Sequence, residues 1–246
     1  MTQYLNTVID RPVTDFRHFS SVLKADAAVK HHWTAIQRKA FRNPANNRWR
    51  IPARKGSVAL DAYDDSVTWA ARGAYQVPTF TSATGNTGRF SASIPNPGNL
   101  ISVLMLSYGT ANASEAWGLH WASDASFIWY SPHRDATNRT LNNGAHINFP
   151  PTSPLNQWNF EAVVIDMANN VCAASTNNGA FVTATPTVVL TPHADANITV
   201  MFGQGITSQP YHNGLISDLA IIAGDVRTMP TLMAAFQEYN QTGYTA

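Results

Sequence analysis

Hydrophobic and polar residues alternate with a period of two along most of the chain after residue 56. The alternation is clearest at 90–94, 117–121 and 198–202. Successive side chains of a β-strand point to opposite faces of its sheet, so this pattern predicts strands with one buried face. No helical period alternates with these segments, which favours an antiparallel all-β sandwich over a parallel α/β sheet. Clusters rich in Gly, Pro and Asn supply the turns, at 84–88, 95–98, 142–144, 150–154 and 177–179.

Two segments carry the helical period instead. The first lies within the N-terminal 55 residues, where apolar side chains recur three, four and seven positions apart and an Asn- and Pro-rich cluster ends the pattern. The second closes the chain, with Thr228 as its cap and Pro230 in its first turn. The predicted apolar stripes are Val22, Leu23, Val29, Trp33, Ile36, Ala40 and Phe41 in the first helix and Leu232, Phe236 and Tyr239 in the second.

Charge divides the chain near residue 55. Residues 1–55 hold eleven Lys and Arg against three Asp, a net charge of +8, whereas residues 56–246 hold five Arg and no Lys against twelve acids, a net charge of −7. Such asymmetry predicts a basic N-terminal arm with one helix at 1–55 and a β-sandwich domain at 56–246. The arm either docks on an acidic partner or folds back onto its own acidic body.

Composition excludes several classes of protein. With 44% hydrophobic residues the chain can bury a core, and its longest strong apolar run, Leu100 to Leu106, is too short to cross a membrane. The single cysteine, Cys172, permits no internal disulfide, and its apolar neighbours predict a buried, unreactive thiol. The N-terminus lacks the basic-then-apolar pattern of a signal peptide, so no Sec-type secretion is expected.

The last hundred residues resemble a known family. The segment 155–166, LNQWNFEAVVID, is similar to the GxWxxVAVTYD strand of laminin-G-like, concanavalin A-like jelly-roll domains. A hairpin at 171–184 with an Asn-Asn-Gly turn, a strand at 198–203 and the segment 211–222, YHNGLISDLAII, follow in the order and spacing of that family. The resemblance covers about residues 57–246 and implies a jelly-roll sandwich. It implies no single function, because this sandwich carries lectins, glucanases, adhesion modules and viral structural domains.

Catalytic patterns are missing from the sequence. The glucanases of this jelly-roll kind need two carboxylates on one face of a strand, written E-x-D-x-E. None of the three glutamates, Glu115, Glu161 and Glu238, has an acid two positions later. The motifs G-x-S-x-G, H-E-x-x-H, G-x-x-x-x-G-K and C-x-x-C are also absent. We therefore predict a non-enzymatic protein with no cofactor and no metal site.

Aromatic and polar residues mark two candidate glycan-binding loops. Rings that stack on sugar faces, together with polar groups that fix the hydroxyls, are what a glycan site requires. The segment 127–135 runs three aromatics straight into a polar loop, and core packing of its rings is the alternative. The candidates are Trp129, Tyr130, His133, Arg134 and Asp135 in this segment and Tyr211, His212 and Asn213 in a second loop.

Basic residues at the end of the predicted arm are candidates for docking onto a partner. They combine positive charge with one aromatic ring, which also fits a single-stranded nucleic acid. The −7 charge of the body would repel a nucleic acid, so an acidic protein surface is the favoured partner. The candidates are Arg48, Trp49, Arg50, Arg54 and Lys55.

Three functions remain open from the sequence. The main hypothesis, by analogy of fold, is a structural or adhesion protein on a virion surface, as capsid decoration, head fibre or tail component. Such a protein would dock through its basic arm, as a homo-oligomer or in many copies, and expose its sandwich to solvent or host glycans. The alternative is a carbohydrate-active enzyme or a glycan-binding module. The third is nucleic-acid binding through the arm.

Overall fold

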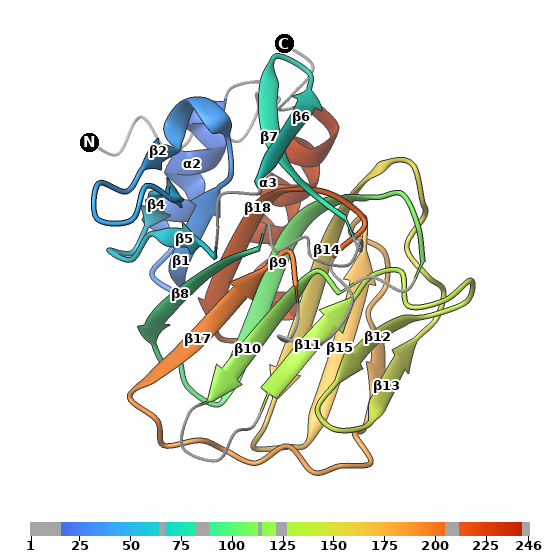
Figure 1. Cartoon of the computed structure of the whole chain (residues 1–246). Helices are drawn as coiled ribbons and strands as arrows, with labels where there is room; N and C mark the ends of the chain where they lie inside the picture. The colour runs from blue at the N-terminus through green and yellow to red at the C-terminus, as the bar shows by residue number, and fades with distance from the viewer. Residues whose placement is uncertain are drawn as a thin grey trace, which may run out of the picture.

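Two antiparallel β-sheets pack face to face and form the body of the protein (Figure 1). The structure is a computed structural model. It describes residues 16–63, 67–81, 89–112, 115–121, 127–204 and 212–242. The all-β sandwich predicted from the alternating pattern is confirmed.

Sheet A has the strand order β16, β15, β14, β9, β18, β1, β4, and the hairpin of β6 and β7 joins it through β18. The pairings of β9 with β14 and with β18 form its middle. Its strands are β1 (Val29–Thr34), β4 (Ala53–Lys55), β6 (Thr68–Arg72), β7 (Tyr75–Phe80), β9 (Leu100–Gly109), β14 (Trp158–Asp166), β15 (Val171–Thr176), β16 (Val182–Ala184) and β18 (Gly214–Ala223).

Sheet B has the order β13, β12, β11, β10, β17, β8, β5, β3, β2. Neighbouring strands in both sheets are antiparallel, and the four segments that carry the jelly-roll resemblance form β14, β15 with β16, β17 and β18. The strands of sheet B are β2 (Phe41–Arg42), β3 (Trp49–Ile51), β5 (Leu60–Ala62), β8 (Phe90–Pro95), β10 (Trp117–Trp121), β11 (Phe127–Ser131), β12 (Arg139–Asn142), β13 (His146–Phe149) and β17 (Asn197–Phe202).

The main core lies between the sheets and is built from every second residue of their strands. Trp117, Leu119 and Trp121 of β10 meet Val103 and Met105 of β9 there, all of them buried. The residues between them point to the outer face of each sheet. Strand alternation therefore decides which side chains can meet a ligand.

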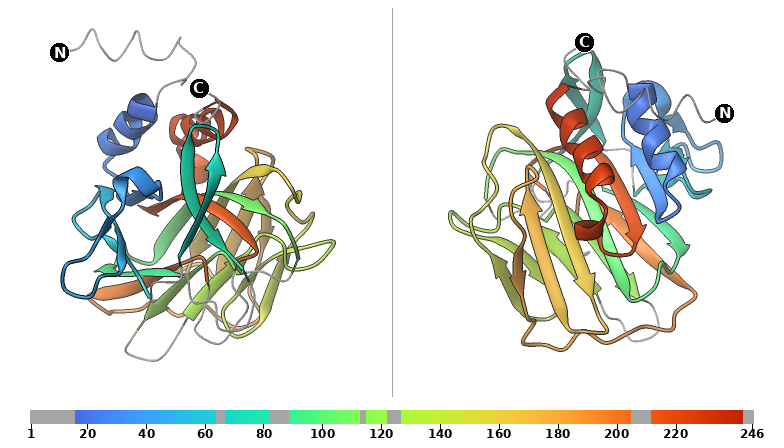
Figure 2. Two further views of the ribbon diagram at one scale, coloured as in Figure 1. Left: turned by 45° about the horizontal axis from the view of Figure 1, so that its top comes forward. Right: turned by 180° about the vertical axis from the view of Figure 1, so that it is seen from behind.

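A second, smaller core covers the outer face of sheet A. Leu104, Leu106 and Phe160 pack there against Leu23 of α2 (Phe16–Ala25) and Phe236 of α3 (Pro230–Thr242). Figure 2 shows both helices on the back of the molecule. The described α-helices thus cover sheet A and leave the outer face of sheet B without a helix. None of the described helices is long and apolar enough to span a membrane.

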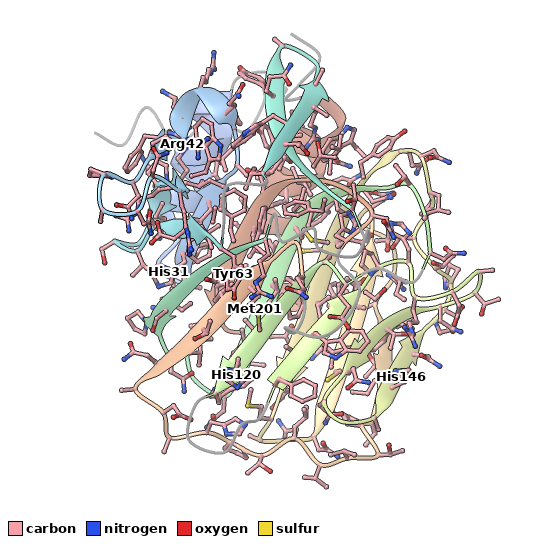
Figure 3. The ribbon with its side chains drawn as sticks, in the orientation of Figure 1. His31, Arg42, Tyr63, His120, His146 and Met201 are labelled. Atoms are coloured by element: carbon pink, nitrogen blue, oxygen red, sulfur yellow. The ribbon has the colours of Figure 1, made fainter. Side chains whose placement is uncertain are left out.

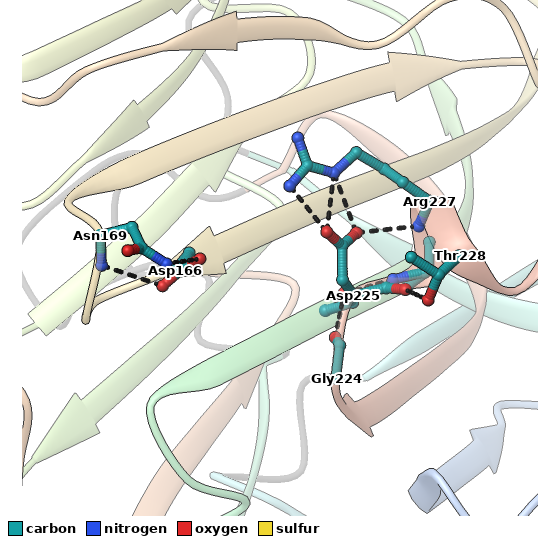
Figure 4. A network of polar contacts seen from close by, with 8 residues as sticks. Asp166, Asn169, Gly224, Asp225, Arg227 and Thr228 are labelled. Atoms are coloured by element: carbon teal, nitrogen blue, oxygen red, sulfur yellow. Dashed lines mark hydrogen bonds and ion pairs between the residues drawn. The ribbon is translucent and has the colours of Figure 1, made fainter.

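Asp225 accepts the hydrogen bonds that hold the turn between β18 and α3 (Figure 4). Its carboxylate accepts hydrogen bonds from the backbone N (2.9 Å) and the guanidinium (2.7 Å) of Arg227, and its carbonyl accepts one from Thr228 Oγ1 (2.8 Å). The hydrogen bonds from Arg227 lower the pKa of Asp225. They close the short 3-10 helix η2 (Val226–Thr228), after which α3 begins at Pro230. The predicted C-terminal helix and its buried stripe are confirmed, whereas Thr228, predicted as its cap, is the last residue of η2.

The first predicted helix is displaced. α2 ends at Ala25, and the residues expected in the middle of the helix form β1 and the 3-10 helix η1 (Gln37–Lys39) instead. A register shift between Val29 and His31 reverses the face of the sheet to which the side chains of β1 point. Val29 therefore packs against the helices, while Trp33 lies in the main core. Because both faces of β1 are buried, its sequence shows no polar–apolar alternation. The spacing of its apolar residues resembles the spacing found along one face of a helix.

Residues 29–55 of the predicted arm contribute strands to both sheets. β1 pairs with β18 and β4, and β3 pairs with β5. Trp33 and Ile51 are fully buried in the main core. This pairing favours the alternative in which the arm folds onto its own body.

Candidate functional site

Nine residues form a continuous row across the outer face of sheet B, which we call the outer row. The strand registers define it, because directly opposed residues of neighbouring strands share one face of a sheet. Their neighbours along each strand, such as Tyr130 beside Trp129, point into the main core. From one edge of the sheet to the other, the outer row is Phe41, Arg50, Asp61, Ser91, Met201, Gly118, Trp129, Asn142 and His146.

The middle of the outer row is apolar. Gly118 lies between Met201 and Trp129, whose exposed fractions are 7% and 4%. The exposed His146 packs its ring edge-on against Trp129, with 6.0 Å between the ring centres. A thioether, an indole and an imidazole thus follow one another along the sheet.

A second row lies two residues further along the strands on the same face. It consists of Ser93, Thr199, His120 and Phe127, each with part of its surface exposed. Figure 3 labels His120 and Met201 on neighbouring strands of this face, and His146 at its far edge. The second row adds hydroxyl, imidazole and aromatic groups beside the outer row.

Tyr63, which Figure 3 labels, forms one end of this face together with Arg89 and Arg48, and we call this end the Tyr63 corner. Tyr63 follows β5, its backbone N donates to the Arg89 carbonyl (2.9 Å), and it is 50% exposed. The guanidinium carbons of Arg89 and Arg48 lie 3.9 and 5.9 Å from the centre of its ring. Beside the corner, Arg50 donates to both carboxylate oxygens of Asp61, at 2.5 and 2.6 Å.

The two aromatic rings predicted to stack on a glycan lie on opposite faces of β11. Trp129 belongs to the outer row, although little of it is exposed. Tyr130 is fully buried, stacks on Trp117 with 5.6 Å between ring centres, and donates a hydrogen bond to Glu161. Adjacent strand residues face opposite sides of a sheet, so the two rings form no common stacking surface. Tyr130 is a core residue, which corrects the role predicted for it.

The predicted polar glycan contacts that follow β11 also lie in different environments. His133 is fully buried with its Nδ1 2.9 Å from the Ser153 carbonyl oxygen, and burial lowers its pKa to about 4. Asp135 is exposed, and hydrogen bonds from Thr137 and Asn138 lower its pKa to about 2. Arg134 is partly exposed. Of these predicted residues, Arg134 and Asp135 are the two that reach the surface.

In the second predicted glycan loop, His212 is internal and Asn213 reaches the surface in part. His212 is fully buried, its ring centre lies 6.4 Å from that of Phe80, and burial lowers its pKa to about 3. Asn213 is partly exposed, and its carbonyl accepts a hydrogen bond from the backbone N of Thr110 (2.8 Å). Tyr211 lies outside the described residues.

A polar network that sequence reasoning did not predict crosses the core behind the outer row. Glu161 of β14 is fully buried, and its Oε2 accepts hydrogen bonds from Tyr130 Oη and Thr176 Oγ1, both at 3.0 Å. Arg139 Nη1 donates to Thr176 Oγ1 at 2.7 Å. Burial raises the pKa of Glu161 to about 7, although the Arg139 charge lowers it. Because it is enclosed between the sheets, the network ties β11, β12, β14 and β15 together.

Lys55, predicted to dock a partner, closes the end of α2. Its Nζ donates to the carbonyl oxygens of Leu23 (3.2 Å), Lys24 (3.0 Å) and Asp26. The last carbonyls of a helix have no partner within the helix, so Lys55 satisfies them from β4. Its neighbour Arg54 is partly buried.

The other three predicted docking residues lie at the edge of sheet B, each with different contacts. Trp49 packs against the main core and edge-on against Trp69, with 5.4 Å between ring centres. Arg50 is paired with Asp61. Arg48 is exposed at the Tyr63 corner. Within the described ranges, no three His, Cys, Asp or Glu side chains gather into a group that could hold a metal ion.

Comparisons with known proteins support the sandwich fold. No family model matches the sequence, and no curated protein does. Domain 4 of AbnA, a GH43 extracellular arabinanase from Geobacillus stearothermophilus, is similar with a TM-score of 0.55 and 15% identity over 84% of this chain and 99% of that chain. Trypanosoma rangeli sialidase is similar with a TM-score of 0.59 and 8% identity over 98% of this chain but 39% of the sialidase. At these identities the likeness shows the fold alone.

These comparisons correct the main functional hypothesis. Among the similar structures are a domain of an arabinanase and several structures of a sialidase. The hypothesis of a structural component of a virus particle gains no support from them and is set aside. They agree with a lectin-like jelly-roll sandwich, whereas the laminin-G-like and viral parts of the resemblance gain no support from them.

Proposed function

We propose that this protein is a carbohydrate-binding module that holds a glycan chain across the outer face of sheet B. The observation that carries the proposal is the second row, where Ser93, Thr199, His120 and Phe127 present hydroxyl, imidazole and aromatic groups on a face that no described helix covers. In the outer row beside it His146 is exposed, whereas Met201, Trp129 and Asn142 are buried beneath the surface. Sugars bind proteins by stacking on apolar side chains while polar side chains fix their hydroxyls. The outer row and the second row together supply both kinds of contact.

The length of the outer row favours a chain of sugars over a single sugar. From Asp61 to His146 the row crosses seven strands. At a strand spacing of about 4.8 Å this is roughly 29 Å. An extended oligosaccharide of several units can lie along such a distance.

The similarity to an arabinanase domain supports the proposal. The match covers 99% of that domain, so the two chains share the architecture of a whole domain, and that structure is a complex with arabinotriose. A sandwich of this architecture can therefore hold an oligosaccharide.

We propose binding without hydrolysis. Most glycosidases use two carboxyl groups about 5–10 Å apart at the scissile bond. Asp61 is the one acidic residue in the nine strands of sheet B, and it is paired with Arg50. The buried Glu161 faces the interior, and the buried Asp218 bonds His32, whose ring packs against α3 on the far side of sheet A.

Binding to a panel of polysaccharides tests this function. Affinity electrophoresis in gels that contain arabinan, xylan, β-glucan or pectin identifies the ligand, and calorimetry with its oligosaccharides measures Kd. His120→Ala combined with Phe127→Ala removes two partly exposed side chains without opening the core. Because each contact contributes on the order of 1 kcal/mol, we expect the double variant to bind about tenfold more weakly or worse.

Val189→Ala is the control, because its side chain is 68% exposed and lies outside both rows. It should bind as the wild type does. Release of reducing sugar in the same mixtures would reveal an enzyme instead of a module. If no polysaccharide retards the protein, the proposal is wrong.

A further inference from the structure

The Tyr63 corner places one buried and one exposed guanidinium beside the same aromatic ring. An arginine that stacks on an aromatic ring keeps the N–H groups at its rim free to donate. Arg89 lies over the Tyr63 ring and is also held by a hydrogen bond to Gln204. Arg48 lies further from the ring centre and is exposed. Arg89 is thus the anchored arginine, and Arg48 is the accessible one.

The corner carries an excess of positive charge. Both carboxylate oxygens of Asp61, in the adjoining strand, are already bonded to Arg50. Among the described residues here, Arg48, Arg50 and Arg89 stand against Asp61. Residues 64 and 65, both Asp in the sequence, lie outside the described residues. The balance favours an anionic ligand group.

The corner also continues the outer row. Asp61 lies opposite Ser91, and Ser91 lies opposite Met201. Tyr63 follows Asp61 by two residues, and its backbone bonds that of Arg89, two residues before Ser91. A glycan that follows the outer row therefore reaches the corner at its arginine-rich end.

We propose that the Tyr63 corner is a subsite for the carboxylate of an acidic sugar, with Arg48 as its main donor. The inference rests on the proposed function and adds the class of ligand, a glycan that contains uronic acid or another carboxylated sugar. A planar carboxylate matches the two parallel N–H groups of one guanidinium. The half-exposed ring of Tyr63 lies beside that guanidinium.

Pairs of ligands that differ only in charge test the subsite. Polygalacturonate, glucuronoxylan and alginate are each compared with their carboxyl-reduced forms, which keep the backbone and lose the charge. A hydrogen bond to a charged group is stronger than one between neutral groups. The wild type should therefore bind at least one acidic form about tenfold more tightly than its reduced form, and by less at high salt. Arg48→Gln should bring this ratio below about threefold and leave affinity for the reduced form unchanged.

Lys24→Gln removes the same charge from α2, which packs on sheet A, and it should keep the wild-type ratio. If the wild type binds the reduced forms and the acidic forms equally, the subsite is wrong while the proposed function stands. If it binds no polysaccharide, the subsite and the proposed function are both wrong. Tighter binding of a sulfated glycan, or of polyglutamate, than of every uronate would identify a general anion or protein surface and overturn the subsite.

Discussion

At the scale of residues, Glu161 makes the stability of the fold depend on pH. Its carboxyl is fully buried between the sheets, and burial raises its pKa from 4.5 to about 7. Between these two values the folded chain keeps a proton that the unfolded chain releases. The contribution of Glu161 to stability is therefore complete below about pH 4.5 and is lost as the pH rises through 7.

We expect Glu161→Gln to remove this part of the pH dependence. Glutamine is neutral at every pH and retains an oxygen that can accept the hydrogen bonds from Tyr130 and Thr176. The pKa values of 4.5 and about 7 imply that, relative to the variant, the wild type loses on the order of 3 kcal/mol of unfolding free energy between pH 4.5 and 8. Urea unfolding of both proteins across this range measures the difference.

The buried histidines do not disturb this comparison. Burial lowers the pKa of His133 to about 4 and that of His212 to about 3. Both therefore destabilise the fold as the pH falls below about 6.5, where the unfolded chain gains protons. They do so in the wild type and the variant alike. Parallel pH profiles of the two proteins would contradict the role given to Glu161.

Part of this residue-level picture can be predicted from the sequence. Strand alternation alone assigns Trp129 and Tyr130 to opposite faces of a strand. The bond between Tyr130 and Glu161 joins residues 31 positions apart, so no local spacing reveals it. Tyr63 has no motif of its own, and it becomes a candidate only because the pairing of β5 with β8 brings Arg89 onto its ring.

At the scale of elements, strands with one solvent face are predictable and strands buried on both faces are not. β10 alternates between the main core and the outer face of sheet B, and its pattern is evident in the sequence. Five of the six residues of β1 are buried, so its sequence has no polar face to reveal the strand. Burial by partners distant in the chain decides the conformation of β1.

β18 begins at a glycine that the pairing with β9 requires. Gly214 has a φ of 143°, and a Cβ there would lie 1.8 Å from the carbonyl oxygen of Tyr108. Gly214→Ala must therefore push apart the two central strands of sheet A, and we expect a loss of roughly 3 kcal/mol of stability. Gly144→Ala is the control, because its φ is 106° and no atom lies within 4 Å of the added Cβ. It should cost about 1 kcal/mol. Thermal melts measure both variants, and equal melting temperatures would refute the packing argument.

At the scale of the whole molecule, the sequence predicts the fold class and the C-terminal strands but not the place of residues 29–55. The change of charge at residue 55 describes surface composition, and surface composition carries no information on strand pairing. The contact between His32 and Asp218 spans 186 positions, beyond the reach of any local pattern. The sequence therefore predicts a separate basic arm, whereas in the structure residues 29–55 add strands to both sheets.

Contrary to the expectation from charge, the strand pairing leads us to expect that the fragment 57–246 does not fold stably. Its truncation deletes β1, β3 and β4, uncovers the edge of β18, and leaves the space of the fully buried Trp33 unfilled. Loss of one buried tryptophan costs about 3–5 kcal/mol, a large share of the roughly 5–15 kcal/mol that stabilises a domain. Thermal melts followed by circular dichroism should show no cooperative transition. The fragment 27–246 is the control: it lacks α2 but keeps every described strand, so it should melt cooperatively at a reduced temperature. A cooperative melt of 57–246 close to that of the full chain would show instead that residue 55 marks a true domain boundary.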